Sequence, residues 1–115
     1  MIVEVFLSLA LICIDKDCHP ALIGEKTPVG EFSLVQRLVK DPFYAGSVLQ
    51  FKETEKEIFS IHRIWNGRPR EKRSQRLQSK DVDKRIITSG CINVSDYVYQ
   101  LLLTCCQNEK ITIYP

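Results

Sequence analysis

Ser89-Gly90-Cys91-Ile92-Asn93 is the most informative stretch of this 115-residue chain. A cysteine directly after a glycine suits thiol acylation chemistry, because glycine lets the backbone approach closely enough to offer N–H groups to an oxyanion. His62, in Ser60-Ile61-His62-Arg63, lies upstream and is a candidate base for the thiol proton. With 5 Cys and 2 His in the chain, this pairing alone is weak evidence. Its weight depends on the rest of the sequence.

The length and composition predict a single domain over residues 1–115. A hydrophobic content of 44% and a charged content of 26% are ordinary for a soluble globular protein. The net charge of +2 is unevenly distributed, since residues 63–85 carry nine basic and three acidic side chains. This segment has three explanations: a solvated loop, a basic lid that holds carboxylates, or a nucleic-acid contact. Its residues 68–83 include no aromatic residue, so we expect no nucleic-acid partner.

Four cysteines lie outside the motif, at positions 13, 18, 105 and 106. An odd total allows one free thiol and up to two disulfides in an oxidising compartment. The alternative is that Cys13, Cys105 and Cys106 are small apolar core residues. No pair has zinc-ligand spacing, and adjacent cysteines on a helix point in different directions, so we expect no metal and no cofactor.

Residues 1–14 are apolar apart from Glu4 and Ser8. A secretory signal has a positive start and a small-residue cleavage site, which this segment lacks, and it is too short to span a bilayer as a helix. We therefore predict a buried strand and no integral membrane segment. An atypical export or anchor segment is the alternative.

Hydrophobic alternation and turn residues predict a mainly β domain. The expected strands cover residues 3–14, 18–23, 31–39, 48–52, 57–65, 85–87 and 110–114. Residues 68–83 are almost entirely polar, which predicts a surface loop or lid. Ser95-Asp96 is a good helix start, and apolar residues recur at helical spacing behind it. This gives one helix directly after the cysteine.

In order along the chain, three motifs resemble the catalytic domain of the bacterial L,D-transpeptidases (YkuD-type). They are Gly24 with Thr27-Pro28-Val29-Gly30-Glu31-Phe32, then Ser60-Ile61-His62, then Thr88-Ser89-Gly90-Cys91-Ile92-Asn93-Val94. The resemblance covers the chain from about Met1 to Tyr114 and implies that family's β-sandwich. Two features depart from the family pattern. Ser89 stands where the family has a histidine. His62 and Cys91 are 29 positions apart, which is longer than the usual family spacing. The resemblance therefore implies that residues 68–83 are an insertion, which we expect to cap the cleft.

The resemblance assigns roles to individual residues. It implies that Cys91 is the nucleophile, that His62 is its base or its imidazolium partner, and that the backbone carbonyl of Arg63 holds the other imidazole nitrogen. The N–H groups of Ser89, Gly90 and Cys91 are the expected oxyanion hole, with Thr88 beside them. Asn93 is expected to hold the turn after the cysteine or to be an ordinary turn residue. Trp65 and Tyr44 are candidates for a substrate groove or for the core, and His19 is expected to lie away from the cleft.

The function implied is a cysteine-dependent L,D-transpeptidase that acts on peptidoglycan stem peptides through a thioester. The outcome is a 3→3 crosslink, D-amino acid exchange or L,D-carboxypeptidase hydrolysis. A papain-like enzyme is disfavoured, because its cysteine precedes its histidine. The alternatives are a secreted effector that attacks a target cell's wall, with an immunity or secretion partner, and an inactive binding protein of this fold. We expect a monomer in the bacterial envelope or periplasm, or secreted.

Overall fold

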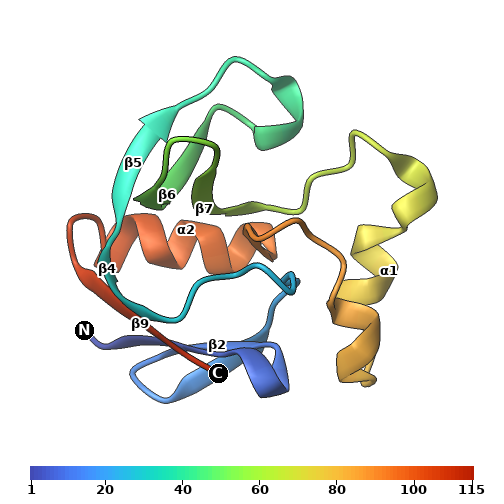
Figure 1. Cartoon of the computed structure of the whole chain (residues 1–115), viewed down its shortest axis with the longest axis horizontal. Helices are drawn as coiled ribbons and strands as arrows, with labels where there is room; N and C mark the ends of the chain where they lie inside the picture. The colour runs from blue at the N-terminus through green and yellow to red at the C-terminus, as the bar shows by residue number, and fades with distance from the viewer.

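The computed structural model describes all residues, 1–115, as two β-sheets with two short helices (Figure 1). One sheet has five strands in the order β3-β2-β1-β9-β4, and the other has four in the order β5-β6-β7-β8. The strands of the first sheet are β1 (Val3–Phe6), β2 (Leu11–Ile14), β3 (Asp17–Pro20), β4 (Gly30–Ser33) and β9 (Lys110–Tyr114). Those of the second are β5 (Val35–Leu38), β6 (Ser47–Glu53), β7 (Ile58–Arg63) and β8 (Ile92–Val94). The mainly β prediction is confirmed.

Two α-helices accompany the sheets, α1 (Arg73–Leu77) and α2 (Asp96–Cys105). Short 3₁₀ turns complete the chain: η1 (Leu7–Leu9), η2 (Pro42–Tyr44), η3 (Pro69–Glu71) and η4 (Val82–Arg85). In Figure 1, α2 lies between the two sheets, and the segment with α1 projects to one side. No helix is long and apolar enough to cross a membrane.

Helix α2 begins where the sequence predicts. The Ser95 side chain accepts a hydrogen bond from the Val98 N–H at 3.1 Å, a standard N-cap that satisfies one free backbone donor. Val98, Tyr99 and Leu102 are buried at helical spacing on one side of α2. They join Ile61 and Ile92 of the second sheet and Ile111 and Ile113 of β9 in one core, so the helix ties the two sheets together.

Four predictions about the elements were wrong. Residues 3–14 form two antiparallel strands, because Ala10 adopts a left-handed conformation (φ 48°) and reverses the chain. Residues 31–39 divide between β4 and β5, which belong to different sheets. Residues 85–87 are not a strand: the 3₁₀ turn η4 ends at Arg85, and Ile86 makes only an isolated bridge. Finally, a second helix exists, and β8 separates Cys91 from α2, so the helix does not follow the cysteine directly.

The segment predicted as a polar loop is folded against the body of the protein. It contains η3, α1 and η4, and Leu77 is its buried apolar anchor. The buried Arg85 guanidinium donates to the carbonyls of Leu9, Ala10 and Ser79, at 2.8, 3.4 and 2.5 Å. These bonds join the segment to the β1–β2 turn, so its position is fixed.

The four cysteines outside the motif form two disulfides, Cys13–Cys18 and Cys105–Cys106. Cys13 and Cys18 face each other across the β2–β3 ladder. The expectation that the adjacent pair points apart was wrong, because α2 ends at Cys105 and Cys106 already has a non-helical backbone (φ −136°). Cys91 is the one free cysteine.

Candidate active site

Strands β7 and β8 bring His62 and Cys91 to the same side of the second sheet. The two strands pair in parallel, with Ile61 opposite Ile92 and His62 opposite Asn93. Alternate residues point to opposite faces, and Ile61 and Ile92 are fully buried in the core. His62 and Asn93 therefore face away from the core, and so does Cys91, two residues before Asn93.

This face carries a cleft of about 200 Å³ that both His62 and Cys91 line. The other lining residues are Tyr44, Trp65, Arg68, Arg73, Thr88 and Ser89. The structure thus gathers around one opening the two candidate catalytic side chains, both candidate aromatic residues and two arginines of the 68–83 segment. His19 lies on β3 beside Asp17 and Tyr97 and does not line the cleft.

Hydrogen bonding determines the tautomer of His62. Its Nδ1 lies 2.7 Å from the Arg63 carbonyl oxygen, and because a carbonyl can only accept, Nδ1 carries the proton. Nε2 then has the lone pair and can accept a proton. Tyr44 packs edge-on against the imidazole, with 4.7 Å between ring centroids, and fixes its orientation from the open side.

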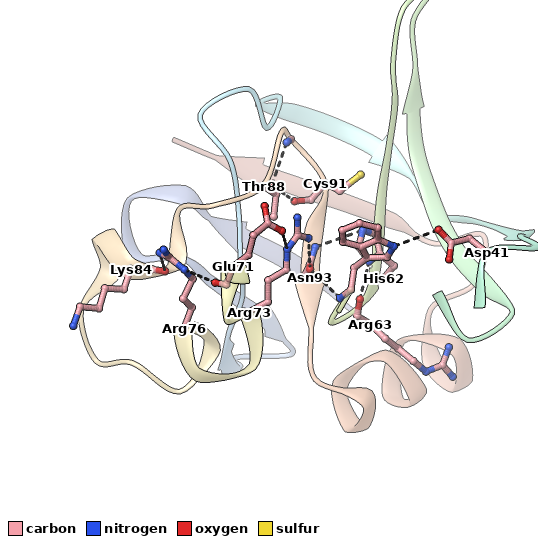
Figure 2. Close-up of polar contacts among 12 residues, drawn as sticks. Asp41, His62, Arg63, Glu71, Arg73, Arg76, Lys84, Thr88, Cys91 and Asn93 are labelled. Carbon is pink, nitrogen blue, oxygen red and sulfur yellow. Dashed lines mark hydrogen bonds and ion pairs between the residues drawn. The ribbon is translucent and has the colours of Figure 1, made fainter. Parts of the chain in front are cut away.

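Asn93 is fully buried and connects His62 to Arg73 of the 68–83 segment (Figure 2). Its Oδ1 accepts from the Arg73 guanidinium at 2.9 Å and from the Trp65 N–H at 3.4 Å. This leaves its Nδ2 facing His62 Nε2, at 3.4 Å. The Asn93 side chain therefore contacts two residues that line the cleft, and Ser95 rather than Asn93 caps α2.

Arg73 is the first residue of α1, and contacts with neighbouring side chains fix its guanidinium near His62 and Cys91. Its Nε donates to Glu71 at 3.0 Å, and its guanidinium lies 5.2 Å from the centre of the Trp65 ring. Sequence analysis missed Arg73, because nothing distinguishes it from the other basic residues of the segment. Only the folded structure shows that it is the one bonded to Asn93.

The backbone around Cys91 is braced by two threonines. Thr88 Oγ1 donates to the Cys91 carbonyl at 2.6 Å and accepts from the Gly90 N–H at 3.1 Å. Thr27, of the Thr27-Pro28 turn, donates to the Gly90 carbonyl at 2.9 Å. The Gly90 N–H is thus occupied, whereas those of Ser89 and Cys91 make no turn or loop hydrogen bond. Of the three expected oxyanion-hole donors, Ser89 and Cys91 therefore retain N–H groups without such a partner.

Both reactive groups are neutral at rest. Burial lowers the pKa of His62 from 6.5 to about 4, and the positive charge of Arg73 acts in the same direction. Burial also raises the pKa of the Cys91 thiol, against the opposing effect of a backbone hydrogen bond from Ser60. The thiol donates instead to the Ile58 carbonyl, at 3.8 Å. The arrangement suits a neutral imidazole that accepts the thiol proton during attack, not a preformed ion pair.

The pKa of His62 predicts a pH-dependent stability. Unfolding returns this pKa to about 6.5, so the unfolded chain binds a proton first as the pH falls. Neutral His62 makes its full contribution to the free energy of unfolding above pH 6.5. This contribution is lost between pH 6.5 and about pH 4, a change of about 3 kcal/mol. Urea unfolding should show that the free energy of unfolding falls less between pH 7 and pH 4.5 in His62→Gln than in the natural protein. Equal losses would mean that His62 does not titrate in this way.

Comparison with known proteins gives a consistent picture of the fold. No protein-family model matches the sequence, and no curated protein matches it in sequence. Among solved structures, an L,D-transpeptidase from Mycobacterium tuberculosis H37Rv matches 99% of the chain (TM-score 0.63, 11% identity). Those from Stackebrandtia nassauensis (TM-score 0.61, 13% identity) and Xylanimonas cellulosilytica (TM-score 0.58, 14% identity) each match 98%.

The chain spans only part of these structures, 57%, 54% and 59% of their respective lengths. The identities are low, so the similarity concerns the fold and not the chemistry. Over its whole length, the chain is similar in fold to the L,D-transpeptidase (YkuD-type) catalytic domain.

Proposed function

We propose that this protein is a cysteine-dependent L,D-transpeptidase that acts on peptidoglycan stem peptides. The observation that carries the proposal is the shared cleft: the one free cysteine and a histidine whose Nε2 carries the lone pair line it together. The fold similarity supports peptidoglycan as the substrate. Two disulfides suit an oxidising compartment such as the periplasm or the cell exterior.

The first half-reaction forms a thioester. Cys91 Sγ attacks the carbonyl of the L,D-peptide bond of a tetrapeptide stem, and its proton passes to His62 Nε2. The N–H groups of Ser89 and Cys91 stabilise the oxyanion. When the bond to the terminal D-alanine breaks, His62 gives this proton to the leaving amine. D-Alanine departs with a free amino group, and His62 is neutral again.

The second half-reaction transfers the acyl group. An amine from a neighbouring stem or a free D-amino acid attacks the thioester carbonyl and gives a proton to His62, which returns it to the departing thiolate. A 3→3 crosslink or an exchanged residue results. With water as the acceptor, the same steps give L,D-carboxypeptidase hydrolysis.

One feature of the resting site favours a second candidate, an inactive binding protein. The Cys91 thiol donates to Ile58, and the lone pair of His62 faces the Asn93 amide, so the two groups are not bonded to each other. An enzyme would need substrate to draw the thiol toward His62. A binding protein would need no such change.

Muropeptide analysis separates the two candidates. Purified cell wall is incubated with the protein and with Cys91→Ala, digested with a muramidase, and analysed by mass spectrometry. The enzyme should produce 3→3 crosslinked or D-amino-acid-exchanged species, or tripeptides, and Cys91→Ala should produce none of them. If both proteins bind the wall and neither changes its composition, the binding protein is the correct interpretation.

A further inference from the structure

Two arginines of the 68–83 segment line the cleft, but only one of them is free. The Arg73 side chain is 12% exposed, and its guanidinium is committed to Glu71, Asn93 and the Trp65 ring. Arg68 is exposed and its side chain makes no hydrogen bond and no ion pair, although it lines the same cleft as His62 and Cys91. It is therefore an unneutralised guanidinium beside the nucleophile.

Charge is distributed asymmetrically around Cys91. Arg68 lines the cleft that His62 and Cys91 share, whereas Glu57, Ile58 and Phe59 line a second, smaller cleft of about 140 Å³ that also reaches Cys91. Glu57 is only weakly paired, with 3.8 Å to the Lys26 ammonium. A substrate carboxylate is attracted by the Arg68 guanidinium, and Glu57 disfavours it in the smaller cleft, so the charges favour an anionic group in the cleft that Arg68 lines.

The terminal carboxylate of a leaving D-amino acid lies close to the carbonyl that Cys91 attacks. One extended residue spans at most about 3.6 Å, so the terminal carboxylate of a leaving D-amino acid lies one residue beyond the carbonyl that Cys91 attacks. Cys91 and Arg68 line one cleft of about 200 Å³, so a leaving group bonded to the carbonyl at Cys91 shares that cleft with the Arg68 guanidinium. The planar guanidinium offers two parallel N–H groups to a carboxylate, a geometry that lysine cannot reproduce.

We propose that Arg68 is the specificity-determining residue of this cleft and binds a carboxylate of the acyl donor by a bidentate ion pair. The identity of the donor as a stem peptide rests on the proposed function. Two carboxylates of a stem peptide fit this chemistry, the C-terminal one of D-alanine and the side-chain one of diaminopimelate. The inserted segment thereby contributes substrate recognition that the two sheets alone do not provide.

A pair of alkylating reagents tests the carboxylate site without any peptide. Iodoacetate and iodoacetamide react with Cys91 in the same way, but only iodoacetate carries a carboxylate. The rate constant for iodoacetate divided by that for iodoacetamide, both measured by intact mass, should fall about fivefold in Arg68→Gln. Arg70→Gln is the matched control, since Arg70 is an arginine of the same segment that lines a separate cavity. An unchanged ratio in Arg68→Gln, or an equal fall in Arg70→Gln, would overturn the proposal.

Donor peptides then identify the carboxylate. Rates of Cys91 acylation are compared for a tetrapeptide stem, its C-terminal amide and its diaminopimelate side-chain amide, with the natural protein and with Arg68→Gln. The amide that removes the difference between the two proteins marks the carboxylate bound by Arg68, and a difference that persists with both amides contradicts binding of either of these two carboxylates. If the alkylation ratio responds to Arg68 but no stem peptide acylates Cys91, the proposed function fails while the carboxylate site stands.

Discussion

Replacing His62 with alanine is expected to slow the acylation of Cys91 by about 10²- to 10⁴-fold, the usual contribution of a positioned base. The resting thiol is neutral, because burial raises its pKa, so attack requires a group that removes the proton. His62 Nε2 is the unprotonated imidazole nitrogen, since Nδ1 carries its own proton toward Arg63, and it must leave the Asn93 amide to accept the thiol proton. The rate of acylation by a stem peptide or a carbapenem, followed by intact mass, measures the effect.

The chain supplies its own control for this experiment. His19 is the second histidine and lies on β3, outside the cleft, so His19→Ala should acylate at the natural rate. Because His62 is buried, His62→Gln should be tested together with the alanine variant, and thermal unfolding should show that both remain folded. A folded His62 variant that acylates as fast as the natural protein would remove His62 from the mechanism.

Gly90→Ala is expected to reduce both stability and activity. Gly90 has φ of +137°, a conformation that residues with a side chain rarely adopt, and a Cβ would lie 2.5 Å from a ring carbon of Phe59. Phe59 is part of the buried core and cannot move freely. Backbone strain and overpacking together should cost about 2–5 kcal/mol. The displaced loop carries Cys91, so acylation should fall as well.

Gly46→Ala separates strain from packing. Gly46 also has a positive φ, of +100°, but a Cβ there meets no atom within 4 Å. This variant should lose only the backbone part, about 1–3 kcal/mol, and retain its acylation rate. Denaturant unfolding of the two variants measures the difference. Equal losses of stability with unchanged acylation in both would contradict a close fit of the Gly90 loop against Phe59.

The elements that could be predicted are those with a clear hydrophobic period. Strands β6, β7 and β9 and helix α2 alternate or repeat at 2 or 3.6 residues, and α2 has a serine N-cap. The N-terminal run is apolar almost throughout, so no period marks where it reverses, and alanine is not a typical residue for the left-handed turn at position 10. Helix α1 has five residues, too few for a helical period.

The site divides in the same way. Cys91, His62 and the glycine before the cysteine stand in local motifs, so the sequence identifies them as candidates. Arg73 and Arg68 belong to a segment in which many residues are basic, and their places in the cleft depend on how α1 is anchored by Leu77 and Arg85. That anchoring is a tertiary property with no local signature. The same holds for the contact between Asn93 and His62, which follows from the parallel register of β7 and β8.

The acyl-enzyme itself provides the decisive observation. The protein is mixed with a tetrapeptide stem at neutral pH and quenched in acid after a short interval. Its intact mass is then measured by mass spectrometry. We expect an adduct with the mass of the stem less its terminal D-alanine, mapped by peptide digestion to Cys91, absent in Cys91→Ala and strongly reduced in His62→Ala. A folded protein that accumulates no adduct and releases no D-alanine, or that carries the acyl group on another residue, would contradict the proposed chemistry.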